Sequence, residues 1–457
     1  MRIADLAGRR VAIWGFGREG HAVITALRAR LLQQSLTLFC SASEVESARA
    51  FDAALEVIGG EPDATMLGGF DVVVKSPGIS AYKPALLAAQ AQGTRFTSGT
   101  ALWFGEHSFG KRPDSRVIAV TGTKGKSTTS ALIAHLTRAL GVRTALAGNI
   151  GLPLLELLDQ RADLWVIELS SFQTGEAGPL ELGVITSLYE EHLDWHGSRE
   201  RYVTDKLRLA DVSQQLLVNA LQPALLERTQ AHPHRLLFGQ PEGWHVADGF
   251  ICRGTQKVLP VAQLAAPGLH NALNACAALA ALAAVGMDAL AAAPALAHFR
   301  PLPHRLQPLG EHDGLAWIND SISTTPEATL AALDSLRGRA VTVLVGGHDR
   351  GLDWSHFVAE VGTHAPHAII CNGANGMRIH QALVRAGHPG TLALEDDLDA
   401  AVARARVLAL SGGCVLLSPG APSFDQFHDY ADRGRHFAEL AGFDGQAITD
   451  IDGLGVV

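Results

Sequence analysis

The sequence predicts an α/β fold of more than one domain, built on parallel sheets. Apolar, strand-like runs alternate with helical patterns throughout the chain, as in parallel α/β sheets. Two of these strands run into a glycine loop and then a helix, near residues 11–30 and 117–140. The length of 457 residues exceeds a single core, so two to three domains are expected.

The most informative motif follows residue 116. Val117-Ile118-Ala119-Val120 predicts a buried strand, and the glycine loop T-G-T-K-G-K-S-T-T then opens a helix that runs to about Leu140. Strand, glycine loop and helix together cradle nucleotide phosphates, because backbone N–H groups face the phosphate oxygens. The loop is a shortened variant, since Val120 stands where the standard motif has its first glycine. The alternative is a glycine turn of an ordinary α/β protein.

The residues of this loop predict an ATP site. Lys126 would reach the β- and γ-phosphates, and the hydroxyl of Ser127 would bind Mg²⁺. The predicted phosphate-binding residues are Gly122, Thr123, Lys124, Gly125, Lys126, Ser127 and Thr128.

A second glycine loop lies close to the N-terminus. The strand Val11–Trp14 is followed by Gly15-Phe16-Gly17-Arg18-Glu19-Gly20, a pattern that by itself would indicate a dinucleotide site. The second strand, Leu36–Phe39, ends in Cys40-Ser41, without the carboxylate that holds the adenosine ribose of NAD. A nucleotide diphosphate other than NAD is therefore expected. Ser76-Pro77-Gly78 follows the strand Val72–Val74 at the sheet edge where ligands bind.

Polar side chains stand at further strand ends downstream of the ATP loop. Glu168 ends the apolar run Trp165–Ile167 and is placed to bind Mg²⁺. A strand is predicted over residues 184–188, and His192 follows it as a candidate second metal ligand. A lone histidine is more often polar surface, and only the convergence of strand ends favours a role for His192. Lys206 by itself would be a solvated charge.

Composition excludes several classes of protein. Apolar residues make up 47% of the chain and charged residues 18%, which indicates a well-packed globular protein. The net charge of −9 argues against a nucleic-acid partner. Five scattered cysteines without a CxxC pair predict reduced thiols in a cytoplasmic protein rather than disulfides or a zinc site. No stretch reaches the roughly 18 apolar residues of a membrane span, so no membrane partner is expected.

Two boundaries divide the chain. The first lies near Thr97, before Ser98-Gly99-Thr100, and the second at Phe299, where Pro301 and Pro303 follow a helix-rich stretch. The predicted domains are therefore residues 1–97, 98–299 and 300–457.

Nine motifs occur in an order that resembles the Mur ligases, and within them most closely the MurD-type ligases that add glutamate to UDP-N-acetylmuramoyl-L-alanine. The resemblance extends to about Phe437, nearly the whole chain. The motifs are GTKGKST, GNIG, ELSSFQ, EEHLDWHG with a later lysine, GLHNALNA, PHR, INDS, VGGHDRG and LLSPGAPSFDQF.

The resemblance implies a Rossmann-like N-terminal domain for the UDP-sugar, a central P-loop ATPase domain and a Rossmann-like C-terminal domain for the amino acid. Lys126, Glu168, His192, Lys206 and Arg305 match catalytic positions of the family. Gly15, Phe16, Gly17, Ser76, Pro77, Gly78, Asn149, Ser170 and Gln173 match its UDP-substrate positions, and Asn271, Arg305 and Asp320 match residues that hold adenine, γ-phosphate and ribose.

The family mechanism implies ATP, two Mg²⁺ sites and a carbamylated lysine as cofactors. Ser127, Glu168, His192 and carbamylated Lys206 match the metal positions. Burial and a nearby cation favour the neutral lysine amine, which CO₂ can carboxylate. The L-alanyl carboxylate attacks the γ-phosphate to give an acyl phosphate, and the amine of glutamate then displaces phosphate. Arg305 and Asp320 lie beyond the second boundary, so the resemblance implies domain closure around the nucleotide.

The chain departs from the D-glutamate-adding pattern only in the amino-acid pocket. Ile322 and Thr325 replace lysine and asparagine, Arg350 replaces a lysine, and Tyr430 replaces a phenylalanine. Thr324 and Ser423 are kept, which gives Thr324, Arg350, Ser423 and Tyr430 as the glutamate-binding residues. A bidentate arginine suits a relocated carboxylate, so the departures favour the L-glutamate-adding branch. The alternative is drift within a D-glutamate enzyme.

Three other classes compete with this interpretation. A dehydrogenase would explain Gly15, Gly17 and Gly20 but not the P-loop. A non-catalytic nucleotide-binding scaffold would tolerate loss of Glu168 or Lys206, yet both are present. Folylpolyglutamate-type ligases lack an N-terminal domain of the UDP-sugar type. Under the favoured interpretation we expect a monomer whose partners are UDP-N-acetylmuramoyl-L-alanine and glutamate.

Overall fold

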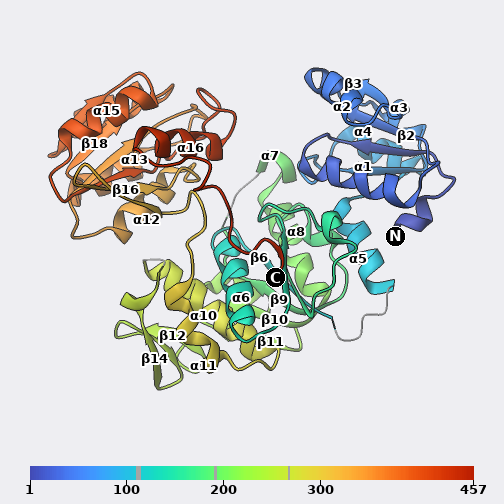
Figure 1. Cartoon of the computed structure of the whole chain (residues 1–457), viewed down its shortest axis with the longest axis horizontal. Coiled ribbons are helices and arrows are strands. Elements are labelled where there is room, and N and C mark those ends of the chain that lie inside the picture. Colours follow the sequence, from blue (N-terminus) through green and yellow to red (C-terminus); the bar gives the residue numbers. More distant parts are fainter. Residues whose placement is uncertain (110–114, 190–192, 266–267) are drawn as a thin grey trace. The chain divides into compact units, whose positions relative to one another are not determined.

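The computed structural model describes residues 1–109, 115–189, 193–265 and 268–457 (Figure 1). It has two compact units. The first comprises Met1–Gln263, His270–Ala297 and Gly453–Val457, and the second comprises Leu264–Leu269 and His298–Asp452. The predicted α/β class with parallel sheets is confirmed, and the largest sheets are parallel except at single edge strands.

The first sheet of the first unit has five parallel strands in the order β3-β2-β1-β4-β5. Its inner strands β2, β1 and β4 are buried along their whole length and largely apolar, because helices cover both faces of the sheet. The strand order reverses at β1, whose neighbours β2 and β4 both run parallel to it, so a topological switch point lies between β1 and β4. The strands are β1 (Val11–Trp14), β2 (Leu36–Cys40), β3 (Glu56–Gly59), β4 (Val72–Lys75) and β5 (Arg95–Thr97), with helices α1 (Arg18–Arg30), α2 (Val45–Phe51), α3 (Ala64–Gly68) and α4 (Pro84–Ala91).

The second sheet of this unit has seven strands in the order β11-β10-β9-β6-β8-β7-β21. Strand β6 lies between β9 and β8, and the short β21 runs antiparallel to β7. The strands are β6 (Arg116–Thr121), β7 (Thr144–Gly148), β8 (Leu164–Glu168), β9 (Leu180–Ile185), β10 (Ser213–Asn219), β11 (Arg235–Phe238) and β21 (Gly455–Val456). The helices are α5 (Gly99–Phe109), α6 (Lys126–Ala139), α7 (Leu193–His196), α8 (Arg199–Asp211), α9 (Pro223–Arg228), α10 (Leu269–Ala284) and α11 (Ala289–Ala292).

Two features of this unit differ from the sequence expectations. The strand expected over residues 184–188 ends at Ile185, because Thr186 and Ser187 hydrogen-bond to the P-loop instead of continuing the ladder. A separate antiparallel sheet, which the pattern did not predict, contains β12 (Trp244–Ala247), β13 (Phe250–Arg253) and β14 (Gln256–Pro260).

The second unit has one six-stranded sheet in the order β15-β16-β20-β17-β18-β19, with β15 antiparallel. The carboxyl ends of β16, β20 and β17 are therefore adjacent. The strands are β15 (Gln307–His312), β16 (Leu315–Asn319), β17 (Val341–Val345), β18 (Ala368–Cys371), β19 (Thr391–Leu394) and β20 (Cys414–Leu417). The helices are α12 (Pro326–Ser335), α13 (Ser355–Thr363), α14 (Gly376–Arg385), α15 (Leu398–Leu408) and α16 (Tyr430–Leu440).

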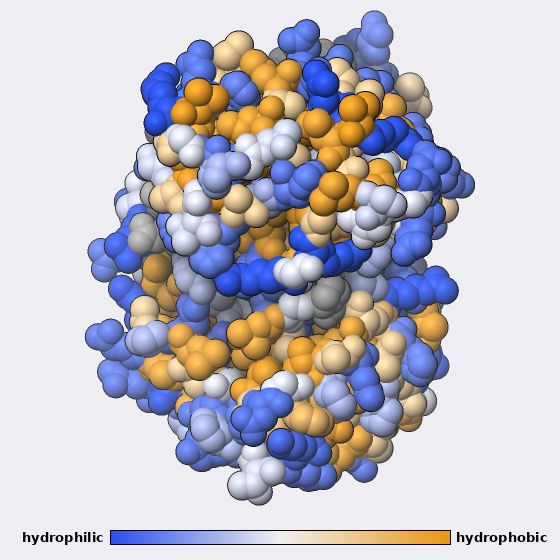
Figure 2. Space-filling view, turned by 90° about the vertical axis from the view of Figure 1, so that its left-hand side faces the viewer, coloured by the Kyte–Doolittle hydropathy of each residue, from blue (hydrophilic) through white to orange (hydrophobic). Residues whose placement is uncertain are grey.

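The surface mixes hydrophilic and apolar residues on the face that Figure 2 presents. None of the helices in the described part of the chain is long and apolar enough to cross a membrane.

Candidate active site

The predicted ATP loop joins β6 to α6. Gly125 takes the N-cap position of α6 with φ +83°, and a Cβ atom there would lie 2.5 Å from Oδ1 of Asn274. At Gly122, φ is +154° and a Cβ atom would overlap the hydroxyl of Thr186. Only glycine fits both positions. The loop thus opens the N-terminus of a 14-residue helix, where backbone N–H groups and the helix dipole attract phosphate.

Side chains from neighbouring elements hold this loop in place. The Lys124 N–H donates to Oγ of Ser187 at 2.8 Å, and the Thr186 hydroxyl donates to the Lys124 carbonyl at 2.6 Å. Thr123 Oγ1 shares a hydrogen bond of 2.6 Å with the Tyr202 hydroxyl. Because these partners come from the loop after β9 and from α8, the loop's shape is set by packing as well as by its glycines.

Asn271 is linked to the same loop through Asn274. The side-chain amide of Asn274 donates to Oδ1 of Asn271 at 3.3 Å, and Oδ1 of Asn274 accepts from the Thr129 hydroxyl at 3.4 Å. Both asparagines lie on α10. Asn274, which also packs against Gly125, was not singled out from the sequence although it lies within the GLHNALNA motif.

Glu168 is fully buried at the end of β8. It pairs in register with Val120 of β6 and with Gly148 of β7. Its Oε1 accepts a hydrogen bond of 2.7 Å from the Asn149 amide, and its Oε2 has no hydrogen-bond partner among the described residues. A buried carboxylate oxygen left in this way fits a divalent cation, because hard cations prefer oxygen ligands.

The other predicted metal residues are Ser127, Lys206 and His192. Ser127 is buried in the first turn of α6. Lys206 is 2% exposed on α8, with Nζ 5.0 Å from the centre of the Tyr202 ring. Since Tyr202 also bonds to Thr123, Lys206 belongs to the P-loop surroundings. His192 lies outside the described residues.

The predicted UDP-substrate loops adjoin at the switch point between β1 and β4. A Cβ atom at Gly15, where φ is +103°, would lie 2.6 Å from Oγ of Ser76. The amide of Ser76 donates to the carbonyl of Trp14 at 2.8 Å, which holds the two loops together. Phe16 is buried, and Gly17 forms the N-cap of α1. The structure therefore brings the loops Gly15-Phe16-Gly17 and Ser76-Pro77-Gly78 together at the carboxyl ends of β1 and β4.

Ser170 and Gln173 form a buried pair in the loop after β8. The Ser170 hydroxyl donates to Oε1 of Gln173 at 2.8 Å, and the Gln173 amide donates to Oγ1 of Thr100 at 3.1 Å. Both side chains are thus fixed, although part of their polar capacity is used within the protein.

In the second unit, Asp320 follows β16 and is 5% exposed. It accepts hydrogen bonds from the amide of Leu306 at 3.0 Å and from the hydroxyls of Ser323 at 2.5 Å and Ser418 at 2.8 Å. Burial is the largest influence on this carboxyl, and it raises the pKa of Asp320 to about 6. Arg305 precedes Leu306 and acts in the opposite direction on that pKa.

The four predicted glutamate residues lie on loops of this unit. Thr324, Arg350 and Ser423 follow β16, β17 and β20, whose carboxyl ends are adjacent, and Tyr430 begins α16. Ser423 is buried, whereas Arg350 is exposed with its guanidinium 6.0 Å from the centre of the Phe424 ring. Phe424, itself 60% exposed, was not predicted.

Arg433 is a further residue that the sequence did not reveal. It is 4% exposed, and its guanidinium donates to the carbonyls of Ser321, Ala421 and Pro422 at 2.8 to 3.1 Å and to the Ser321 hydroxyl at 3.0 Å. Burial lowers the pKa of Arg433 to about 10. This side chain ties the loop after β16 to the loop after β20, which carries Ser423.

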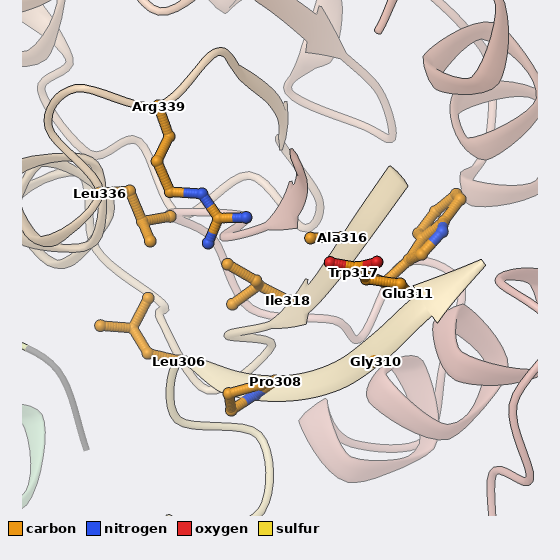
Figure 3. A pocket seen from close by; sticks show the side chains of 9 residues that line it. All are labelled: Leu306, Pro308, Gly310, Glu311, Ala316, Trp317, Ile318, Leu336 and Arg339. Atoms are coloured by element: carbon orange, nitrogen blue, oxygen red, sulfur yellow. The ribbon is translucent and has the colours of Figure 1, made fainter. Parts of the chain in front are cut away.

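A pocket of about 260 Å³ lies elsewhere in the second unit. Figure 3 shows the Arg339 side chain extending toward Ile318 beside strands β15 and β16. None of the predicted site residues lines it. The lining residues are Leu306, Pro308, Gly310, Glu311, Ala316, Trp317, Ile318, Leu336 and Arg339.

Three family domains match the chain in order. The Mur ligase MurD-like N-terminal domain matches residues 9–98, the Mur ligase middle domain matches residues 120–282, and the Mur ligase glutamate ligase domain matches residues 304–420. These matches cover each of the loops described above, except that the last match ends at residue 420, within the loop after β20.

Three relatives that match nearly the whole chain carry the same name. The protein named UDP-N-acetylmuramoyl-L-alanine--L-glutamate ligase from Xanthomonas axonopodis pv. citri (strain 306) is 52% identical to this chain. The protein of the same name from Xylella fastidiosa (strain Temecula1 / ATCC 700964) is 50% identical to it, and each alignment covers 100% of both chains. A third, from Micromonospora sp. (strain ATCC 39149 / NRRL 15099 / SCC 1413), is 40% identical over 96% of this chain and 98% of its own.

Solved structures share the fold at low sequence identity. The UDP-N-acetylmuramate-alanine ligase MurC from Thermotoga maritima has a TM-score of 0.61 and 19% identity, and covers 94% of this chain and 98% of its own. The MurF ligase from Thermotoga maritima in complex with ADP has a TM-score of 0.57 and 16% identity, over 98% of this chain and 97% of its own.

Proposed function

This chain belongs to the Mur ligase family, and we propose that it is the ADP-forming ligase that joins L-glutamate to UDP-N-acetylmuramoyl-L-alanine. The reaction forms a peptide bond in a precursor of peptidoglycan and consumes ATP. The observation that carries the proposal is the 52% identity, over the full length of both chains, to a relative with that name.

The chemistry proceeds in two balanced steps. First, the terminal carboxylate of the alanyl group attacks the γ-phosphorus of ATP, the bond to the β-phosphate oxygen breaks, and an acyl phosphate and ADP form. The amine of glutamate then attacks the acyl carbon, and the tetrahedral intermediate loses phosphate and a proton to leave the amide. Lys126 at the start of α6 supplies positive charge for the phosphoryl group in the first step. Arg305 is proposed for the same phosphate.

Magnesium is proposed as the counter-ion of the phosphates. Glu168 fits this role because one of its buried oxygens lacks a hydrogen-bond partner among the described residues. The other residues that we propose as metal ligands are Ser127, His192 and Lys206, and together with Glu168 they would serve two Mg²⁺ sites. A bound Mg²⁺ would neutralise charge that develops on the transferring phosphoryl group.

A carbamate on Lys206 completes this proposal. The side chain is 2% exposed and lies beside an aromatic ring. Burial disfavours the ammonium form of a lysine, so the neutral amine is available to react with CO₂. The resulting anion would add an oxygen ligand where a second cation has to bind.

Glutamate is assigned to the loops that carry Thr324, Arg350, Ser423 and Tyr430. Arg350 is exposed next to Phe424, so its guanidinium is accessible to a carboxylate from solution. A planar fork matches a carboxylate in two hydrogen bonds, which a lysine cannot reproduce. We propose the cytoplasm as the compartment of the reaction, and the five buried free cysteines support this because reduced thiols are typical of that compartment. A monomer remains the prediction.

One experiment tests the proposal. Phosphate release is measured with UDP-N-acetylmuramoyl-L-alanine, ATP and Mg²⁺, with L-glutamate in one series and D-glutamate in the other. Turnover that depends on L-glutamate is expected. Equal or faster turnover with D-glutamate would leave the ligase chemistry standing but reverse the stereochemical assignment, and absence of phosphate release with either isomer would overturn the function.

A further inference from the structure

A chain of side-chain hydrogen bonds crosses the first unit beside Lys206. Ser171 Oγ and His196 Nε2 share a hydrogen bond of 3.0 Å, and His196 Nδ1 lies 2.8 Å from Oδ2 of Asp205. The hydroxyl of Tyr82 donates to both carboxylate oxygens of Asp205 at 2.8 Å. Because a carboxylate only accepts, Nδ1 of His196 carries the proton of that bond.

The order serine, histidine, aspartate is also that of a nucleophilic triad. Here the three side chains are buried, with exposed fractions of 4%, 0% and 5%, and Tyr82 covers the carboxylate. A triad needs its serine hydroxyl open to a substrate carbonyl, and Ser171 is not. The chain of hydrogen bonds is therefore suited to holding elements together rather than to attack.

The elements that it joins are those of the proposed site. Tyr82 follows the Ser76-Pro77-Gly78 loop, and Ser171 follows Ser170 in the loop after β8. His196 ends α7, and Asp205 immediately precedes Lys206 on α8. One connected set of hydrogen bonds thus reaches from a UDP-substrate loop to the helix that carries the proposed carbamate.

Trp195 forms a second connection between the same elements. Its indole N–H donates to the Pro77 carbonyl at 3.1 Å, and its own carbonyl accepts from the Ser80 hydroxyl at 2.5 Å. Its ring stacks on Phe172, with 4.6 Å between ring centres. The substrate loop is therefore docked on the central domain by several directional contacts.

The backbone at Asp205 is fixed as well. Its carbonyl accepts a hydrogen bond of 2.6 Å from the hydroxyl of Thr174, which lies in the same loop as Ser171. The carboxylate of Asp205 also lies 3.6 Å from the guanidinium of Arg208. With both its backbone and its side chain held, this turn of α8 sets where the next residue, Lys206, can place its side chain.

We propose that Tyr82 and Asp205 are positioning residues, whose hydrogen bond aligns the loop that binds the UDP-sugar with the turn of α8 that carries Lys206. The inference rests on the proposed function, since it assigns the UDP-sugar to the Ser76-Pro77-Gly78 loop. Neither residue has to touch a substrate. Their contribution is to make the placement of Lys206 depend on a correctly seated substrate loop.

The test uses Tyr82→Phe, Asp205→Asn and the double variant in the full-length enzyme. The phenylalanine keeps the ring that lies 5.8 Å from Trp195 and beneath Arg201, and loses only the donor. Each single variant is expected to lower kcat/KM for UDP-N-acetylmuramoyl-L-alanine by about tenfold or more, as for a lost hydrogen bond to a charged group, while the KM for ATP stays within about twofold. The double variant should lose no more than the more impaired single variant, because the hydrogen bond between Tyr82 and Asp205 can be removed only once.

Lys83→Ala is the matched control. Lys83 adjoins Tyr82 but forms an exposed ion pair with Glu61, so its removal should change neither parameter. Ser171→Ala tests the far end of the chain if Asp205→Asn fails to fold. Losses that multiply in the double variant, equal increases in both KM values, or values within about twofold of wild type would each overturn the inference.

Calorimetric binding of UDP-N-acetylmuramoyl-L-alanine separates this inference from the proposed function. Weaker binding by Tyr82→Phe than by wild type and Lys83→Ala is expected, whichever glutamate isomer the enzyme uses. A wild-type protein that binds this nucleotide but releases no phosphate with glutamate would overturn the proposed function alone. Unchanged binding together with unchanged kcat/KM in Tyr82→Phe would overturn the positioning role alone.

Discussion

Asn149 donates its side-chain amide to one oxygen of Glu168 at 2.7 Å and leaves the other oxygen of that buried carboxylate without a hydrogen-bond partner among the described residues. The asparagine fixes the orientation of the carboxylate, and the strand pairing of Glu168 with Val120 fixes its distance from the P-loop. A carboxylate held in this way is prepared for a cation rather than for a protein partner.

The first prediction follows from that arrangement. Glu168→Gln keeps the shape and removes the negative charge, so the Mg²⁺ concentration for half-maximal phosphate release should rise by about tenfold or more. Titration of Mg²⁺ at saturating ATP measures it. Glu61→Gln, which changes an exposed carboxylate in the same unit, should leave the Mg²⁺ requirement as in wild type. A Glu168→Gln enzyme with the wild-type requirement would rule out metal binding at this residue.

The second prediction concerns Lys126 in the first turn of α6. Lys126→Ala should lower the rate of ADP formation by about 10² or more, because the transferring phosphoryl group loses a positively charged partner. A coupled ADP assay measures the rate. Lys257→Ala removes an exposed lysine from the sheet β12–β14 and should have no effect. Near-normal turnover in Lys126→Ala would contradict the assignment of the P-loop.

The third prediction tests the carbamate. Lys206→Ala should be nearly inactive, and short-chain carboxylates should restore part of the activity by occupying the space of the carbamate. Phosphate release is measured with and without added acetate or propionate. The same additives should not raise the activity of Lys126→Ala, because that variant lacks a phosphate-binding cation rather than a carbamate. Failure of every short carboxylate to restore activity, together with a plain ammonium at Lys206 in a wild-type crystal structure determined with bicarbonate and Mg²⁺, would exclude the carbamate.

The fourth prediction is stereochemical. The enzyme should prefer L-glutamate over D-glutamate by about 10² or more, because the wrong isomer leaves a cation of the site unpaired. Arg350→Lys should raise the KM for glutamate and leave the KM for ATP nearly unchanged, since a point charge cannot replace the planar fork. Initial rates with each isomer measure both effects. An Arg350→Lys enzyme with an unaltered glutamate KM would remove Arg350 from the pocket.

The fifth prediction is a dependence of stability on pH. The pKa of Asp320 is raised to about 6 by burial. Between an unfolded pKa near 4 and this folded value, the folded state binds more protons than the unfolded state. The free energy of unfolding therefore loses a contribution of up to about 3 kcal/mol as pH rises from 4 to 6.

Asp320→Asn should remove that decline, because an amide does not titrate. Urea unfolding of wild type and variant at pH 4.5 and pH 7 measures how much the free energy of unfolding of each changes with pH. Asp313→Asn, which changes an exposed carboxyl, serves as the control. Parallel pH profiles for wild type and Asp320→Asn would show that Asp320 does not titrate in this range in the folded protein.

The sequence predicted the local parts of this fold well. The run from Val117 to Val120 and the glycines after it determine a strand, a loop and a helix within 25 residues, because burial pattern and backbone freedom are local properties. The strand expected to extend through Leu188 ends earlier, since Thr186 and Ser187 bond to a loop more than 60 residues away. Pairing at that separation leaves no periodic signal.

Site residues that belong to a recognisable motif were predicted from the sequence. Residues whose role comes from packing between distant segments were missed. Lys126 and Glu168 stand in patterns that a phosphate and a cation require. In the sequence, Arg433 is one polar residue among several in a helical pattern. In the structure its guanidinium donates hydrogen bonds to two loops that are about 100 residues apart in sequence. Tyr82 and Asp205 are separated by 123 residues, so only the folded structure relates them.

The pairing of β21 with β7 has a consequence for how the second unit is attached. Residues 453–457 return to the first unit, so the long segment His298–Asp452 of the second unit is joined covalently to the first unit at both of its ends rather than at one. Two anchors restrict the rotations open to an inserted body far more than one does, because each closed loop removes conformations. Any rearrangement of the second unit must therefore be one that the connections at both ends of this segment permit.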